Sequence, residues 1–320
     1  MRLSYCPRQS NRSAPAPQRR ARTNQFEALE GRVLFSTLTV TNTHDHGAGS
    51  LRAEIAAAHN GDTIVFASSL FHAGKTTKIT LSSGELTLAK NLTIQGPGAN
   101  KLNLFGNWYG LSPLYWPDNT TTPSRGFEIA AKAKVTLSGL TISGGDGVAS
   151  ASSSATWNHF GGALLNHGTL TVSSCTVSGS SAWNEGGGIF SDKTLTVSHS
   201  TISGNYAYVG AGVSNHRIAT FTSDTISKNY GTDLTSDNYH PATEGGGIFN
   251  HGTLTVSGCT VSGNFATSGG GIFNQGTVTI KSSSRITGSL NSDDAANFGV
   301  LYLDGTSTIG VLDGNVAIRI

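Results

Sequence analysis

Short runs in which apolar and small polar residues alternate recur through the second half of the chain. Thr253-Leu-Thr-Val256 is followed by Thr260-Val261, and the same pattern occurs earlier as Thr194-Leu-Thr-Val197 followed by Thr201-Ile202. Alternation with a period of two, rich in β-branched residues, is typical of β-strands that bury one face. A further strand is expected at Gly-Gly-Ile-Phe, 246–249, and Asn-His-Gly and Ser-Gly-Asn turns separate the three runs.

These three runs and their turns form a repeat. Copies begin at Gly161, Gly186, Gly210, Gly245 and Gly269, so a unit of about 24 residues recurs with one insertion. Three short strands and three turns in a unit of this length are typical of one coil of a parallel β-helix, whose coils stack about 4.8 Å apart. The sequence therefore predicts an all-β chain folded as a right-handed, single-stranded parallel β-helix.

Stacking places equivalent residues of successive coils in columns. Two apolar columns are expected inside the coil: Leu170, Leu195, Ala219, Leu254, Val278 and Val172, Val197, Phe221, Val256, Ile280. Two turn columns are rich in asparagine: Asn166, Ser191, Asn215, Asn250, Asn274 and Asn205, Asn229, Asn264. Asparagine tolerates turn backbone and bonds to its own chain, so these columns are predicted to be turn ladders. Cys175 and Cys259 share a column about 14 Å apart, too far for a disulfide, and are expected to be buried.

Charge divides the chain into two parts. Only 12% of the 320 residues are charged and 41 are Gly, which suits tight turns. Residues 1–36 carry seven Arg against two Glu, whereas the remainder is mildly acidic. We expect 1–36 to be a disordered basic sorting segment and 37–320 to be one β-helix domain, with a cap and irregular coils over 37–160, regular coils over 161–290 and a C-terminal cap over 291–320. The folded part lacks a basic stripe, which argues against a nucleic-acid partner.

The end of the basic segment resembles the sorting motif written LEPR-xLL, which occurs on large surface and exported proteins of some bacteria. The matching positions are Phe26, Glu27, Leu29, Glu30, Arg32, Leu34 and Ser36. Gly31 stands where Pro is usual, and a short amphipathic helix is the alternative interpretation. The resemblance implies a protein that is secreted or held at the cell surface or outer membrane of a bacterium.

Residues 39–66 predict a strand, a loop, a helix and a second strand. Ser50 is a suitable N-cap, and Leu51, Ile55 and Ala58 lie on one helical face. An open end of a β-helix would pair with other chains, so a short capping helix near 50–59 is expected. The stretch resembles the SLR-x-A-I and GDTI-x-F opening of bacterial β-helix surface proteins, at Ser50, Leu51, Arg52, Ile55, Gly61, Asp62, Thr63, Ile64 and Phe66.

The repeats resemble the passenger domains of polymorphic outer-membrane proteins and related adhesin-like β-helices. The shared elements are Gly-Gly-x-Ile at one turn, as in Gly245–Ile248, and an apolar residue, two small residues and Asn at another, as in Val261–Asn264. The resemblance covers about residues 126–290. It implies an exported, non-catalytic surface or adhesin-like protein whose partners are extracellular glycans or other cell-surface components. No apolar run is long enough to span a membrane as a helix.

Catalysis is the alternative. Polysaccharide lyases and glycoside hydrolases of the pectate-lyase-like type share this pectin-lyase-like solenoid, so the fold leaves activity open. That resemblance implies acidic calcium ligands and an Arg base for the lyases, and paired carboxylates for the hydrolases. Acidic residues are scattered here: Glu185 and Glu244 share a column but lie about 10 Å apart. No catalytic residue is therefore assigned, and calcium is a cofactor only under the lyase alternative.

Histidines form one column that could in principle bind a metal. His167, His216 and His251 occupy equivalent positions, and Asp192 fills the rung between the first two. Imidazole and carboxylate are zinc ligands, but rungs about 5 Å apart exceed the spacing of a tetrahedral site. An exposed turn column is the alternative interpretation, and no resident metal is expected.

Aromatic residues are the main candidates for glycan binding. Those that precede the Gly runs by a few residues are Trp157, Trp183, Tyr206, Tyr208 and Phe265. Their rings could stack on sugar faces or simply cover the core. Trp108 and Trp116 lie in a Pro- and Thr-rich excursion over 106–125, and 232–242 is a second insertion. Long loops on a rigid scaffold commonly carry recognition, so both are candidate binding loops.

Overall fold

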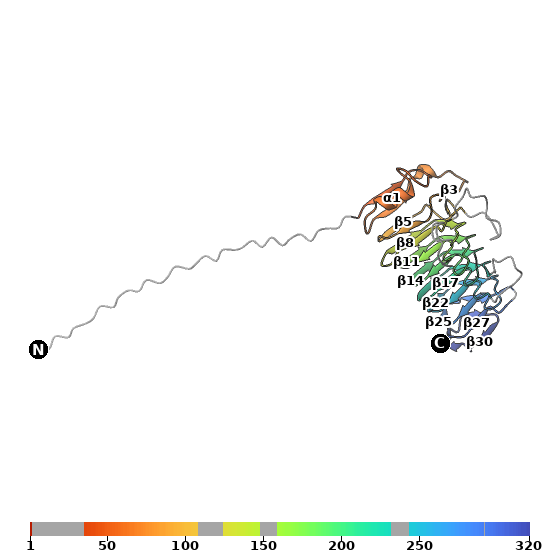
Figure 1. Cartoon of the computed structure of the whole chain (residues 1–320). Coiled ribbons are helices and arrows are strands. Elements are labelled where there is room, and N and C mark those ends of the chain that lie inside the picture. The colour runs from red at the N-terminus through yellow and green to blue at the C-terminus, as the bar shows by residue number, and fades with distance from the viewer. Residues whose placement is uncertain (2–34, 108–123, 148–158, 232–242, 291) are drawn as a thin grey trace. The chain divides into compact units, whose positions relative to one another are not determined.

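The computed structural model describes residues 1, 35–107, 124–147, 159–231, 243–290 and 292–320. All of the described helices and strands belong to one compact unit, Phe35–Ile320 (Figure 1). Its helices are α1 (Leu51–Ala57) and the short 3-10 helix η1 (Ser68–Leu70). Within the described ranges, neither these nor any other helix is long and apolar enough to cross a membrane.

The strands stack into three parallel sheets. Sheet A runs β1 (Thr37–Val40), β2 (Thr63–Phe66), β5 (Leu92–Gln95), β8 (Lys134–Ser138), β11 (Thr169–Ser173), β14 (Thr194–Ser198), β18 (Ile218–Thr222), β22 (Thr253–Ser257), β25 (Thr277–Lys281), β28 (Val300–Leu303), β31 (Ile318–Arg319). Sheet B runs β3 (Thr77–Thr80), β6 (Leu102–Phe105), β9 (Thr141–Ser143), β12 (Thr176–Ser178), β15 (Thr201–Ser203), β19 (Thr225–Ser227), β23 (Thr260–Ser262), β26 (Arg285–Thr287), β29 (Thr308–Ile309). Sheet C runs β4 (Leu86–Leu88), β7 (Phe127–Ile129), β10 (Leu164–Asn166), β13 (Ile189–Ser191), β17 (Val213–Asn215), β21 (Ile248–Asn250), β24 (Ile272–Asn274), β27 (Ala295–Asn297), β30 (Leu312–Gly314). A small outer sheet pairs β16 (Tyr206–Ala207) with β20 (Tyr230–Gly231).

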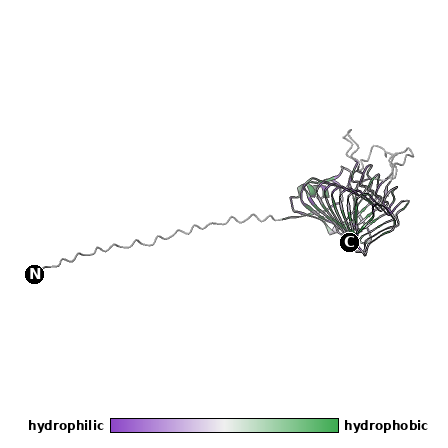
Figure 2. Cartoon of the chain, turned by 90° about the horizontal axis from the view of Figure 1, so that it is seen from below, coloured by the Kyte–Doolittle hydropathy of each residue, from purple (hydrophilic) through white to green (hydrophobic). Residues whose placement is uncertain are grey.

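This arrangement confirms the predicted parallel β-helix. Strand order in each sheet follows the chain, and equivalent repeat residues pair directly, as Leu195 does with Ala219 and Ala219 with Leu254. Parallel crossovers of this kind are right-handed. In the end-on view of Figure 2 the coils lie one behind another around a hydrophobic interior. Both predicted inward columns are buried, since none of their side chains is more than 2% exposed.

The two asparagine columns are turn ladders, as predicted. Asn250 Nδ2 donates to Asn274 Oδ1 at 2.8 Å, and Asn274 Nδ2 donates to Asn297 Oδ1 at 2.7 Å. The second ladder runs in the same way through Asn205, Asn229 and Asn264. These side chains are almost fully buried, and the amides of Asn205, Asn229, Asn250 and Asn274 each donate to the asparagine of the next coil.

A third ladder lies at the turn from sheet A to sheet B. Its rungs are Cys175, Ser200, Asp224, Cys259 and Ser284, all buried. The N–H of Cys175 donates to Ser200 Oγ at 3.1 Å, and the N–H of Ser200 donates to Asp224 Oδ1 at 2.8 Å. Both cysteines are free and buried, which confirms the prediction that they are packed residues rather than a disulfide.

Helix α1 begins at its predicted N-cap beside the first strand of sheet A. Ser50 Oγ accepts a hydrogen bond from the Ala53 N–H at 3.2 Å, and Leu51 and Ile55 are buried. Arg52 fastens the helix to the coil below, because it pairs with Asp45 at 2.8 Å and donates to backbone carbonyls of the turn before β4. The helix therefore covers the N-terminal end of the core, as the sequence predicts.

Asp224 makes the stability of the fold depend on pH. The residue is 2% exposed, and its carboxylate accepts hydrogen bonds from the N–H groups of Ser200 and Thr222, both at 2.8 Å. Burial outweighs these bonds and raises the pKa of Asp224 from 3.8 to about 6. A carboxyl whose pKa is raised by folding holds its proton more tightly in the native state. Its contribution to stability is therefore complete below pH 3.8 and is lost as the pH rises through 6.

We predict that Asp224→Ser removes this pH dependence. Serine already occupies the same column at Ser200 and Ser284, and its hydroxyl can accept the Ser200 N–H bond. At about 1.4 kcal/mol per pKa unit, the free energy of unfolding of the unsubstituted protein should fall by about 3 kcal/mol relative to D224S between pH 3.5 and pH 7.5. Urea unfolding at the two pH values measures this difference. If the free energies of unfolding of the two proteins differed by the same amount at both pH values, the raised pKa of Asp224 would be contradicted.

Candidate functional site

The outer face of sheet C is covered by a second layer of backbone. Isolated bridges join Phe160, Glu185, Val209, Glu244 and Ser268 into an outer column. Beneath it, Phe190 and Phe249 are each 7% exposed and Phe273 is 5% exposed, although they point away from the main core. We call the outward side chains of sheet C together with this outer column the covered face.

A ladder of rings runs along the covered face. Phe160 and Phe190 stack with centroids 4.7 Å apart, Phe249 and Phe273 stack at 5.7 Å, and Phe273 continues to Phe298 at 5.3 Å. The rings form a second apolar layer outside the coil, on which Val209 of the outer column packs. Packed aromatic pairs of this kind stabilise a structure beyond the area that they bury.

His216 fills a gap in this ladder. Ser214 stands at the rung between Phe190 and Phe249, and the His216 ring lies 5.0 Å from the first phenylalanine and 6.0 Å from the second. Glu185 contacts both side chains. Its Oε2 accepts a hydrogen bond from Ser214 Oγ at 2.7 Å and lies 2.6 Å from His216 Nε2. The histidine thus serves as a ring in the stack and as a partner for a carboxylate.

The predicted histidine and aspartate candidates form pairs and do not converge on one point. His167 Nδ1 lies 2.9 Å from Asp192 Oδ2, whereas His216 is engaged with Glu185. His251 lies against the His216 ring, with centroids 5.7 Å apart. Across the described ranges, no three His, Cys, Asp or Glu side chains are grouped closely enough to hold a metal ion.

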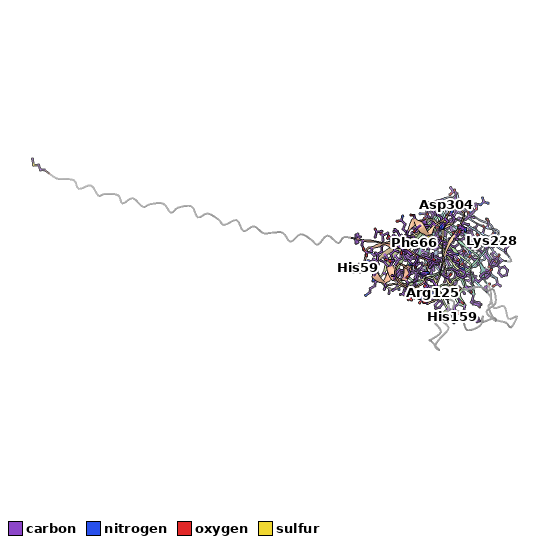
Figure 3. All side chains as sticks on the ribbon, turned by 90° about the horizontal axis from the view of Figure 1, so that it is seen from above. His59, Phe66, Arg125, His159, Lys228 and Asp304 are labelled. Atoms are coloured by element: carbon purple, nitrogen blue, oxygen red, sulfur yellow. The ribbon has the colours of Figure 1, made fainter. Side chains whose placement is uncertain are left out.

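A buried arginine organises the N-terminal part of the covered face. Arg125 is 5% exposed, and its Nη1 pairs with the Glu85 carboxylate. Its Nε donates to Gly161 O at 2.9 Å, and its Nη2 donates to Phe160 O at 3.0 Å and to Gly147 O at 3.4 Å. One guanidinium therefore joins three successive coils. Figure 3 shows Arg125 and His159 on the same side of the coil.

Ionisable groups around Arg125 are held toward their neutral forms. Burial and the neighbouring Glu85 raise the pKa of Glu128, and Arg125 and His167 oppose that shift only in part. Burial, followed by the charge of Arg125, lowers the pKa of His159. Farther along the covered face, burial and Glu185 raise the pKa of Glu244. Opposite shifts in an acid and a base at one place are a feature of sites that transfer protons.

The described aromatic candidates lie at the turn between sheets B and C. Trp183, Tyr206 and Tyr208 are half-buried there. Tyr206 stacks on Tyr230 with centroids 5.4 Å apart and an interplanar angle of 16°. The column through Tyr206 continues to Phe265, and its preceding rung is Ser181, so Trp183 lies two residues beyond that column. We call Trp183, Tyr206, Tyr208 and Tyr230 the aromatic turn.

Three further aromatic candidates, Trp108, Trp116 and Trp157, lie outside the described residues. The flanks of the three longest undescribed internal segments all belong to the turn from sheet B to sheet C: Asn107 and Ser124, Gly147 and His159, Gly231 and Thr243. Both predicted excursions, 106–125 and 232–242, therefore start from the side of the coil that carries the aromatic turn. Arg125 holds the two flanks of the middle segment together through Gly147 and Phe160.

Sequence reasoning did not identify Glu85, Arg125, Glu128 and His159. The first three lie in early coils that precede the regular repeats, where the spacing of Gly runs gives no register. One signal was available: Phe127-Glu-Ile129 has the alternation of a sheet C strand and pairs with Leu164-Leu-Asn166. Extending that column by one coil would have placed Glu128 on the covered face.

Comparison with known proteins adds a similarity of fold. No protein family matches the chain, and no curated protein matches it. Among solved structures, "Crystal structure of pectate lyase Pel9A" is similar with a TM-score of 0.43 and 11% sequence identity, over 88% of this chain and 79% of that chain. At this distance the similarity assigns no residue and no activity, so the function has to be argued from the chain's own side chains.

We predict that His216→Phe is tolerated whereas His216→Ala is not. Phenylalanine restores the ring found at neighbouring rungs, so H216F should change the free energy of unfolding by less than about 1 kcal/mol, while the void left by H216A should cost about 2 kcal/mol. Chemical denaturation measures both. The same assay with zinc chloride tests metal binding, because a zinc-dependent stabilisation that H216F abolishes would show His216 to be a metal ligand.

Proposed function

We propose that the protein is an exported, non-catalytic β-helix module of the surface or adhesin-like kind, which binds glycans at the aromatic turn. The observation that carries the proposal is the stacked, half-exposed pair of Tyr206 and Tyr230, with Trp183 and Tyr208 beside it. A sugar ring has an apolar face that packs on an aromatic side chain and a rim of hydroxyl groups that needs polar partners. The aromatic turn offers rings on a rigid scaffold.

A polar partner for sugar hydroxyls lies in the outer column. Glu244 lies there two rungs from Glu185, with Val209 between them, and Glu185 itself is engaged by Ser214 and His216. Carboxylates accept hydrogen bonds from hydroxyl groups, and the raised pKa of Glu244 keeps its protonated form, which can also donate, available to a higher pH than usual. Rings with such groups beside them favour a neutral glycan over a strongly anionic one.

The N-terminal segment and the repeats support the proposed export of the protein and its proposed partners. The LEPR-xLL-like motif and the adhesin-like repeats support a protein that is secreted or at the cell surface or outer membrane of a bacterium. Its proposed partners are then extracellular glycans or cell-surface components, and no cofactor is proposed.

An acid–base enzyme is the second candidate, and one observation favours it. Glu128, with its raised pKa, interacts with His167, and His167 is oriented by Asp192 at 2.9 Å. A carboxylic acid beside an oriented imidazole is a combination used for general acid–base catalysis of polysaccharide cleavage. Against it, the Glu85 carboxylate and Arg125 are already engaged with each other, so neither is directed at a substrate.

We predict that replacing Trp183 and Tyr208 together by Ala lowers binding on a glycan array by at least about tenfold, because the apolar platform for the sugar face is lost. The matched control is Tyr302→Ala, which removes an aromatic ring from sheet A, away from the aromatic turn. Equal glycan binding by W183A/Y208A and the unsubstituted protein would contradict the assignment.

The enzymatic alternative is decided by a lyase and hydrolase assay. Pectate, alginate and neutral polysaccharides are incubated with the protein, with and without calcium, and unsaturated products and reducing ends are measured. We expect no turnover. Turnover that Glu128→Gln and His167→Asn both abolish would replace the binding proposal by the enzymatic one.

A further inference from the structure

The outer face of sheet A carries an unbroken ladder of threonine. Nine consecutive strands place a threonine at the same outward position: Thr37, Thr63, Thr93, Thr136, Thr171, Thr196, Thr220, Thr255 and Thr279. The tenth rung is Tyr302. At the usual strand spacing of about 4.8 Å the threonine rungs extend over about 38 Å.

Repetition of the 24-residue unit does not account for this ladder. Its first four rungs lie in β1, β2, β5 and β8, outside the regular coils, where turn lengths and inward residues differ. The outward column two residues earlier is not uniform, because it contains Lys134, Ile218 and Val300 among its threonines. Valine or isoleucine would meet the demand of a strand for β-branched residues equally well. The position therefore keeps threonine for its hydroxyl as well as its shape.

The ladder hydroxyls are directed at solvent. The nine side chains are half-buried or exposed, and within the described part of the chain no hydrogen bond joins their hydroxyls to a protein group. Two outward threonines of sheet B differ, since Thr77 Oγ1 donates to Leu70 O at 2.6 Å and Thr141 Oγ1 donates to Ala99 O at 2.7 Å. A β-branched side chain has few rotamers, so in-register pairing repeats one methyl and one hydroxyl at a fixed interval.

That interval is close to a repeat of hydrogen-bonded water. With O–H···O distances of about 2.75 Å and tetrahedral angles, second-neighbour oxygens in an ordered water network lie about 4.5 Å apart. The threonine spacing of about 4.8 Å exceeds this by about 0.3 Å per rung. Over a run of a few rungs, each threonine hydroxyl can therefore bind one water oxygen of the same row. The methyl groups between the hydroxyls disfavour disordered water at the same surface.

We propose that the outer face of sheet A binds ice through the threonine ladder. The column is uncharged, repeats in register and is held by a stacked backbone, so many weak contacts can act together without ordering any loop. The face lacks the features of the glycan site, because aromatic rings are absent from the nine rungs. The proposal is independent of the aromatic turn.

The test uses the full chain and its variant Thr196→Tyr, Thr220→Tyr. Tyrosine already occupies the column at Tyr302, so the variant is expected to keep the fold, which circular dichroism and thermal unfolding verify. We expect the unsubstituted protein to slow ice recrystallisation and to shape single ice crystals. The variant, whose rings break the row at its centre, should need at least about ten times the concentration for the same effect.

Matched controls separate the ladder from other surfaces. Thr201→Tyr, Thr225→Tyr makes the same change at paired positions on sheet B and should keep full ice activity, as should W183A/Y208A. The proposal is overturned if ice grains grow as fast with the unsubstituted protein as with an equal mass of serum albumin, or if T196Y/T220Y retains its activity. It is also overturned if sedimentation shows a dimer that T196Y/T220Y dissociates, because the ladder is then a self-association surface.

Discussion

In-register stacking of coils is the constraint on which the rest of this protein depends. One spacing sets the backbone pairing of all three sheets and the side-chain ladders at their turns. Asn250 donates its buried amide to Asn274 Oδ1 because Asn274 stands in the equivalent place one coil later. A residue that breaks a column therefore needs a substitute from the neighbouring turn, and departures from the repeat show where special chemistry lies.

Much of the fold followed from the sequence because columns can be read wherever the register is known. The Gly runs fix that register over the regular coils, and the inward columns, the asparagine ladders and the unpaired cysteines are found there as predicted. The cap was predictable for another reason, since Ser50 and the apolar face of α1 are local signals.

The candidate site was less accessible because its contacts cross between columns. The ring missing at Ser214 is supplied by His216, two residues later. The repeat column that contains His216 therefore does not reveal that its ring packs between the neighbouring phenylalanines. Glu85 and Arg125 meet across early coils of unequal length, where repeat spacing gives no alignment. At the aromatic turn, the segment from Tyr206 to Val209 is one residue shorter than the segment from Ser181 to Glu185, so the spacing from the Gly runs does not give the pairing of these residues.

The asparagine ladders have a direction, and this bears on how such a chain changes length. From Asn215 to Asn297 each asparagine donates to the asparagine of the coil after it, so the junctions between these coils present the same pair of groups. A coil inserted or lost as a whole leaves each junction chemically unchanged. The units that begin at Gly245 and Gly269 share Gly-Gly-Gly-Ile-Phe-Asn and then differ at most positions, although their strands keep the same register. The number of coils is thus open to genetic change while the core of each coil stays constrained.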